Sequence, residues 1–126
     1  MTVYVVDDVI DAADSLVQLL MAMGHDARAF YNAESLWKAV QQETPDCVML
    51  DIAMAGTNGL ELAQRLKSQF GDDIVLVAVT GASHDEPLVQ QTFVAVDHYF
   101  EKPVTLAQIQ RIFAPQVSTA PVEFDT

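Results

Sequence analysis

Two short runs of the sequence contain no polar side chain, and they constrain the fold more than any other feature. Residues 47–50 and 74–79 consist only of apolar residues, and their lengths suit a strand rather than a helix. Strands without polar residues are buried on both faces, as in parallel sheets that helices cover on each side. We therefore predict an α/β fold built around a parallel sheet.

Strand-like and helix-like patterns alternate along the chain. The strands are expected at residues 3–6, 27–31, 47–50, 74–79 and 98–100. Helical spacing of apolar residues follows each of them, so that helices are expected to end at Gly24, to begin near Asn32, to follow residues 56–59, to begin near Asp85 and to end before Pro115. Five strand–helix units with right-handed crossovers favour the flavodoxin-like three-layer α/β/α sandwich, with strand order 2-1-3-4-5, over the dinucleotide-binding order. Residues 1–114 are expected to form this domain, and residues 115–126 a C-terminal tail or linker.

Charge and apolar content argue against several classes of partner. Eighteen Asp and Glu residues against six Lys and Arg residues give a net charge of -12. This is the wrong sign for direct binding to nucleic acid or to an anionic membrane surface. The chain has no apolar run long enough to span a membrane, no basic start of a secretion signal, and a single cysteine, Cys47. We expect a cytoplasmic protein.

Acidic residues follow two of the predicted strands. In an open α/β sheet the ligand lies beyond the carboxyl ends of the strands. The first strand is followed by Asp7 and Asp8, and the third by Asp51; these strands are neighbours in the flavodoxin-like order. Two ionised carboxylates about 5 Å apart repel by about 3 kcal/mol at an effective dielectric constant of about 20. Either one carboxylate stays protonated or a divalent cation binds, and we favour Mg²⁺, because it prefers oxygen ligands and retains bound water.

A carboxylate in such a place can act as a nucleophile towards phosphorus and form an acyl phosphate. Asp51 is the best candidate because it stands alone at its strand end, whereas Asp7 and Asp8 can share the metal. Thr80 closes the fourth strand and Lys102 follows the fifth, so that a hydroxyl donor and a positive charge lie within reach of the phosphoryl group. These residues predict phosphoryl chemistry at Asp51.

Five segments of the chain resemble motifs of the receiver domains of two-component response regulators. They are VVDD at residues 5–8, MLDIAM at 49–54, NGLEL at 58–62, VTG at 79–81 and YFEKP at 99–103. Each motif is short, but all five occur in the order of the family and at the expected strand ends. The resemblance covers residues 3–113, which is nearly the whole chain.

The resemblance implies a phosphorelay function and a set of ligands. A phosphohistidine on a histidine kinase or a histidine phosphotransfer protein would phosphorylate Asp51. Asp8 and Asp51 would bind Mg²⁺ directly, Asp7 would bind it through water, and the backbone carbonyl of Ala53 would add a further ligand. Lys102 would pair with the phosphoryl group.

The resemblance also implies a conformational switch. Thr80 would move towards the phosphoryl group, and Tyr99 would follow by changing its rotamer. The surface formed by the fourth helix, the fifth strand and the fifth helix would then meet a downstream protein target. Such a domain is a switch rather than a turnover enzyme, although it would help to catalyse its own phosphorylation and dephosphorylation.

Two other functions remain open at this point. A small phosphatase of the haloacid-dehalogenase type also uses an aspartate nucleophile, magnesium, a threonine and a lysine, but it places the nucleophile on the first strand and the acid pair late in the chain. Here the acid pair comes first. A flavin-binding module would need a phosphate-binding loop of Ser, Thr and Gly after the first strand, where this chain carries Asp7 and Asp8.

Overall fold

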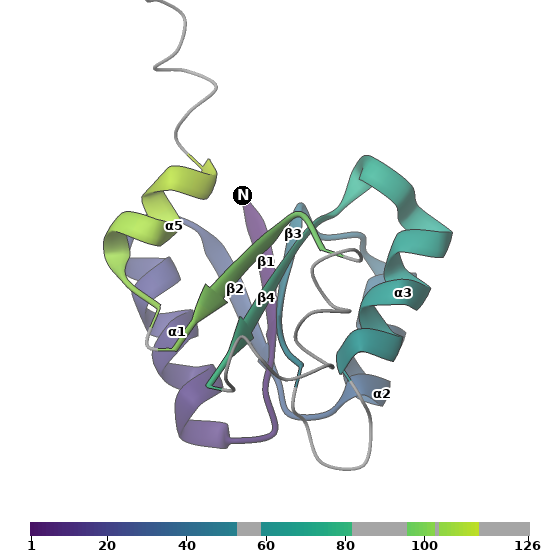
Figure 1. Cartoon of the computed structure of the whole chain (residues 1–126), viewed down its shortest axis with the longest axis horizontal. Helices are drawn as coiled ribbons and strands as arrows, with labels where there is room; N and C mark the ends of the chain where they lie inside the picture. Colours follow the sequence, from purple (N-terminus) through teal and green to yellow (C-terminus); the bar gives the residue numbers. More distant parts are fainter. Residues whose placement is uncertain (53–58, 82–95, 103, 114–126) are drawn as a thin grey trace, which may run out of the picture.

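The computed structural model describes residues 1–52, 59–81, 96–102 and 104–113 (Figure 1). The elements in chain order are β1 (Thr2–Val6), α1 (Ile10–Ala22), β2 (Asp26–Phe30), α2 (Ala33–Gln42), β3 (Cys47–Asp51), α3 (Gly59–Phe70), the 3-10 turn η1 (Gly71–Asp73), β4 (Val75–Thr80), β5 (His98–Glu101) and α5 (Leu106–Phe113). Ala53, the helix expected near Asp85 and the tail at residues 115–126 lie outside the described residues.

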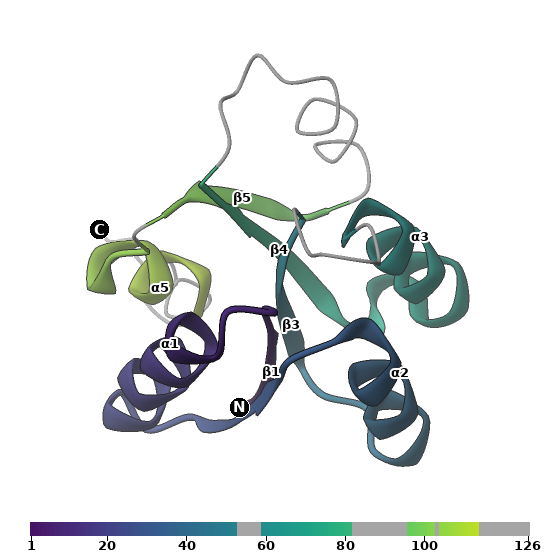
Figure 2. The ribbon, with the colours of Figure 1, turned by 90° about the horizontal axis from the view of Figure 1, so that it is seen from below.

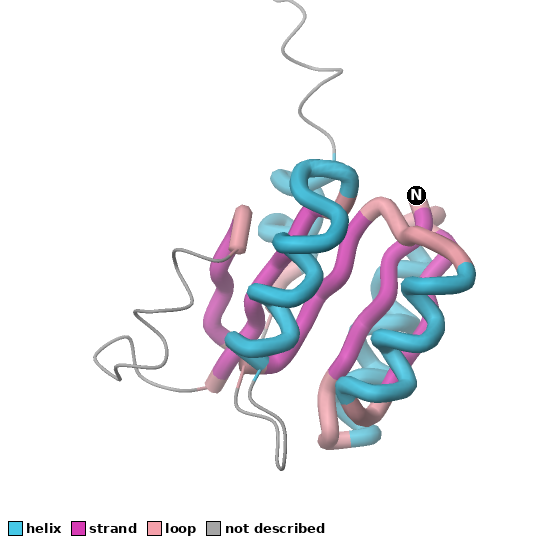
Figure 3. Tube along the Cα trace, turned by 90° about the vertical axis from the view of Figure 1, so that its right-hand side faces the viewer, coloured by secondary structure: helices cyan, strands magenta, loops and turns pink. Residues whose placement is uncertain are grey.

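The strands form one parallel sheet in the order β2-β1-β3-β4-β5, which confirms the predicted fold class. Figure 2 shows α1 and α5 on one face of this sheet and α2 and α3 on the other. The strands lie side by side with a layer of helices crossing in front of them in Figure 3. The strands β1, β3 and β4 are almost entirely buried, as the apolar runs predict for β3 and β4.

The core consists of two layers, one on each face of the sheet, because alternate residues of a strand point to opposite sides. Tyr4 and Val6 of β1 pack towards α2 and α3, whereas Val3 and Val5 pack towards α1 and α5. The first layer also contains Leu36, Val48, Leu50, Leu62, Leu66 and Leu76, and the second Leu20, Met49, Val77, Ile109 and Ile112. Within the described residues, no helix is long and apolar enough to cross a membrane.

At the amino edge of the sheet, where the strands begin, an aspartate precedes β3 and another precedes β5. The Asp46 N–H donates to the Thr2 carbonyl at 2.9 Å, and Asp46 Oδ2 accepts the Thr2 N–H at 2.8 Å. Asp97 repeats this arrangement with Leu76, at 2.8 Å for both bonds. Each carboxylate thus continues the hydrogen-bond ladder by one step and fixes how the two strands align.

The alignment of the strands determines which residues meet at the carboxyl edge of the sheet, where the strands end. Val6 pairs with Leu50 in the next strand, and Asp51 pairs with Val79. Residues that follow β1, β3 and β4 therefore emerge at the same level of the sheet. This level is where the sequence predicts the functional residues.

Candidate functional site

The carboxyl edge brings together four residues that the sequence analysis singled out. Asp7 follows β1, Asp51 and Thr80 are the last residues of β3 and β4, and Lys102 follows β5. The Lys102 N–H donates to the Thr80 carbonyl at 2.8 Å, which continues the pairing of β4 with β5 beyond the strand end. Residues separated by up to 95 positions in the chain therefore share one site.

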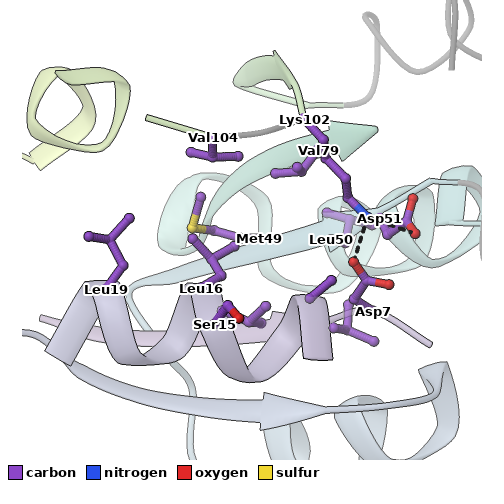
Figure 4. Close-up of a pocket in the computed structure, with 13 residues that line it drawn as sticks. Asp7, Ser15, Leu16, Leu19, Met49, Leu50, Asp51, Val79, Lys102 and Val104 are labelled. Atoms are coloured by element: carbon purple, nitrogen blue, oxygen red, sulfur yellow. Dashed lines mark hydrogen bonds and ion pairs between the residues drawn. The ribbon is translucent and has the colours of Figure 1, made fainter. Parts of the chain in front are cut away.

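The Lys102 ammonium lies between two carboxylates (Figure 4). Its Nζ donates to Asp7 Oδ2 at 2.7 Å and to Asp51 Oδ2 at 3.4 Å. The Asp7 and Asp51 side chains are only 7% and 8% exposed, whereas the Lys102 side chain is 30% exposed. Buried carboxylates are costly without a charged partner, so the lysine stabilises both of them.

The surroundings of Lys102 change its pKa in two opposing directions. Burial lowers the pKa of the ammonium, because the low dielectric of the interior disfavours charge. The hydrogen bond to Asp7 and the charges of Asp51 and Asp7 raise it, and together they outweigh burial. The pKa of Lys102 is therefore above its ordinary value, and the side chain is a cation throughout the physiological range.

Asp7 is held in place by its neighbours in the chain. Its N–H donates to the Phe30 carbonyl at 3.0 Å, which attaches the end of β1 to the end of β2. Its Oδ1 accepts the N–H of Val9, the residue that caps α1, at 2.9 Å. The carboxylate is thereby fixed with Oδ1 on the helix and Oδ2 on Lys102.

Three carboxylates form a candidate metal site. Asp7, Asp8 and Asp51 each offer one oxygen atom, and these atoms all lie within 4.8 Å of one another. Asp7 and Asp51 are buried, and Asp8 is exposed. A set of hard oxygen ligands that is open to solvent on one side suits Mg²⁺, which usually keeps several waters in its coordination shell. The residues present therefore fit the predicted ion.

Gly59, the first residue of α3, brings its backbone against the strand end that carries Asp51. Its N–H donates to the Ile52 carbonyl at 3.2 Å. A Cβ atom at this position would overlap the Ile52 Cα and would lie 2.5 Å from the Asp51 carbonyl oxygen. From the sequence, this glycine is expected only at the start of a helix; the glycine itself, within the NGLEL motif, is the available signal for the close approach.

Thr80 and Tyr99 lie on adjacent strands near the site. Thr80 is fully buried at the end of β4. Tyr99 is half-buried on β5 and packs against a small apolar cluster of Ile52 and Ala78. Ile52 directly follows Asp51, so this cluster connects Tyr99 with the strand end that carries the predicted phosphoacceptor.

Comparison with known proteins identifies the family. Residues 3–114 match the response regulator receiver domain. The chain belongs to this family. The receiver domain is 28% identical over 130 residues to the phosphate regulon transcriptional regulatory protein PhoB of Pseudomonas aeruginosa, in an alignment covering 97% of this chain and 57% of PhoB. The chain therefore spans little more than half the length of this relative.

Solved receiver structures have the same fold. A CheY-like receiver domain from Methylobacillus flagellatus superposes with a TM-score of 0.79 at 26% identity, covering 89% of this chain and 94% of that one. The response regulator protein TrrA from Thermotoga maritima, solved in complex with Mg²⁺-BeF, gives a TM-score of 0.78 at 26% identity, covering 88% of this chain and 94% of that one. These superpositions confirm the predicted flavodoxin-like fold.

Proposed function

We propose that this receiver domain accepts a phosphoryl group on Asp51 in a Mg²⁺-dependent step, and that a phosphohistidine of a histidine kinase or a histidine phosphotransfer protein donates it. One observation carries the proposal: three carboxylates within 4.8 Å of one another lie beside the Lys102 ammonium at the carboxyl edge. A cation and oxygen ligands for a metal are the groups that phosphoryl transfer to a carboxylate requires.

The proposed ligands of Mg²⁺ are Asp8 and Asp51 directly, Asp7 through water, and the backbone carbonyl of Ala53, which lies outside the described residues. Bound there, the ion would supply positive charge to the phosphoryl oxygens. The relative TrrA, solved in complex with Mg²⁺-BeF, supports the choice of ion. The exposure of Asp8 supports a site that exchanges its ion with solvent.

In the proposed transfer, an Asp51 carboxylate oxygen forms a bond to phosphorus while the bond from phosphorus to the histidine nitrogen of the donor breaks. The donor imidazole leaves with the electron pair and takes up a proton. Lys102, which already lies 3.4 Å from Asp51 Oδ2, then pairs with a phosphoryl oxygen. Lys102 follows β5, the last strand in the order of the sheet. The proposed movement of its ammonium therefore leaves the central strands β1, β3 and β4 in place.

The proposed output begins at Thr80 and Tyr99. The Thr80 hydroxyl moves to donate to the phosphoryl group, and Tyr99 changes rotamer over the Ile52 cluster. The surface of β5, α5 and the helix expected near Asp85 then contacts a downstream protein. We assign residues 1–114 to the receiver domain and residues 115–126 to a tail or linker. A receiver domain is a signalling switch, which sets this chain apart from enzymes that turn over a substrate.

Intact-mass spectrometry tests the proposal. Incubation with a small acyl phosphate and MgCl₂ is expected to add one phosphoryl group to the wild-type chain, and EDTA is expected to prevent the addition. Asp51→Asn removes the nucleophile and should abolish it. Asp72→Asn, a change at a fully exposed carboxylate, is the matched control and should be phosphorylated like the wild type.

Two outcomes would contradict the proposal. A phosphoryl gain that survives Asp51→Asn would place the acceptor elsewhere. Repeated turnover of an external phosphomonoester would favour the phosphatase alternative, because a receiver domain is expected to take a phosphoryl group onto its own aspartate rather than to hydrolyse phosphomonoesters.

A further inference from the structure

A cavity of about 500 Å³ adjoins the site on the side of α1. One wall is α1, and the opposite wall is the face of β1, β3 and β4. Figure 4 shows Leu16 and Leu19 of α1 pointing towards Met49 and Val104. The volume lies within the range of small-molecule sites, about 300–1,000 Å³. At one end, next to the site, the cavity is lined by the polar residues Asp7, Asp51 and Lys102.

The walls and the end of this cavity differ in chemistry. The walls are aliphatic side chains and the Met49 thioether, and Ser15 adds a hydroxyl from α1. The end consists of two carboxylates, each more than nine-tenths buried, and the half-buried Lys102 ammonium. An apolar chamber with charged groups at one end suits a molecule that is apolar along its length and carries a charge at its tip.

The sign of that charge follows from the groups at the polar end. Asp7 and Asp51 contribute two negative charges to the lining, and Lys102 contributes one positive charge that is already shared between them. The exposed Asp8 adds a third carboxylate, with an oxygen within 4.8 Å of theirs. The whole chain has a net charge of -12. An anionic head would meet buried carboxylates that repel it, whereas an ammonium head donates to them.

We propose that this cavity binds an amphiphile with an aliphatic body and a primary ammonium head, with the head on Asp7 and Asp51. Because the head would use carboxylates assigned to Mg²⁺, the amine and the ion would exclude each other. A bound amine would thus hold the domain in a form that cannot accept a phosphoryl group on Asp51. This last consequence rests on the proposed function, whereas binding itself does not.

Heptylamine is the probe, titrated into the ¹⁵N-labelled full chain without Mg²⁺ or phosphodonor. Amide shifts are expected at Leu16, Met49 and Val104, with those of α2 and α3 unchanged. Heptanol has the same body without the charge and should bind about tenfold more weakly, because it lacks a charge-assisted hydrogen bond. Heptanoate should bind more weakly still.

Equal binding of amine and alcohol, stronger binding of heptanoate, or shifts confined to the exposed acidic turn at Asp72 and Asp73 would each overturn the proposal. Leu16→Phe fills part of the cavity and should weaken heptylamine binding about tenfold. Met21→Phe, on the exposed side of the same helix, is the matched control and should leave it unchanged. If Leu16→Phe does not fold, the titrations of the wild type with heptylamine, heptanol and heptanoate still test the proposal.

Competition separates this proposal from the proposed function. MgCl₂ at about ten times its own Kd should weaken heptylamine binding about tenfold if both use the same carboxylates. A chain that binds heptylamine but is not phosphorylated would refute the phosphoacceptor function and leave the cavity proposal intact. A chain that is phosphorylated but does not bind heptylamine would refute the cavity proposal and leave the phosphoacceptor function intact.

Discussion

The two edges of the sheet use aspartate in opposite ways. At the amino edge, the carboxylates of Asp46 and Asp97 accept N–H groups of the neighbouring strands. At the carboxyl edge, Asp7 and Asp51 lie side by side and share one ammonium. A carboxylate that replaces a step of the backbone ladder fixes geometry, whereas the two carboxylates that share one ammonium form, with Asp8, the candidate metal site. The partners of each aspartate, rather than its residue type, distinguish the structural positions from the candidate site.

Gly59→Ala is expected to have the largest effect on stability and should act at the carboxyl edge. The added methyl group would overlap the Ile52 backbone, so we expect the free energy of unfolding to fall by about 3 kcal/mol. Chemical denaturation measures the change. Gly81→Ala lies at the same edge, where no atom of the described residues is within 4 Å of the added Cβ, and it should change stability little. Similar losses in the two variants would show that close backbone approach is not the cause.

Asp97→Ala tests the amino edge. It leaves the Leu76 N–H without its acceptor, and the free energy of unfolding should fall by about 1–3 kcal/mol. Asp97→Asn keeps an acceptor oxygen and should restore most of the loss in the same denaturation experiment. If the asparagine variant is as unstable as the alanine variant, the negative charge matters more than the backbone bond, and the two edges differ less than we infer.

The pKa values of Lys102 and Lys67, measured by alkaline titration, compare the electrostatics of the carboxyl edge with those of the amino edge. Because the pKa of Lys102 is raised on folding, its ammonium stabilises the fold fully below the ordinary value of 10.5, and this contribution is lost as the pH rises through the higher folded pKa. Lys67, whose pKa is raised chiefly by the charge of Asp97, reports on the amino edge. NMR of ¹³C-labelled lysine measures both.

Each lysine should respond only to its own edge in this titration. Asp7→Asn should lower the pKa of Lys102 and leave that of Lys67 unchanged, and Asp97→Asn should do the opposite. A single substitution that moves both pKa values would mean that the edges are coupled through the sheet.

The thiol of Cys47 gives the smallest expected signal. Burial raises its pKa, and the charges of Asp97 and Asp46 at the same edge raise it further. The thiol is fully buried, so at pH 8 an alkylating reagent should reach it only through unfolding. Asp97→Ala should speed modification in proportion to its loss of stability. Rapid alkylation of Cys47 in the folded wild type would show that the amino edge opens without unfolding of the whole domain.

Much of the fold could be predicted from the sequence, because strands buried on both faces leave a readable pattern. Residues 47–50 and 74–79 identify β3 and β4, although Ile74 is buried just outside the strand, after η1. The expected strand at 27–31 is shifted by one residue. Tyr31 leaves β2, and its hydroxyl donates to Asp14 at 2.6 Å. Such boundaries depend on side-chain partners that periodicity does not reveal.

The candidate site could be predicted in outline only. Asp7 and Asp51 follow neighbouring parallel strands, so topology alone brings them together. The contact of Lys102 with Asp7 joins residues 95 positions apart, and the pairing of β5 with β4 that permits it is a contact between strands that periodicity does not reveal. The close approach of Gly59 and the cavity beside α1 are likewise products of three-dimensional packing, which local pattern does not encode.

The order of the strands also predicts different mobilities for Asp51 and Lys102. β3, which ends in Asp51, has β1 on one side and β4 on the other, whereas β5, which leads to Lys102, is bordered by β4 at the rim of the sheet. Amide protons of a central strand exchange with deuterium only when most of the molecule opens, whereas those of a rim strand exchange through smaller fluctuations. Asp51 is thus held by a strand that is paired on both sides, whereas Lys102 follows a strand that is expected to open more readily.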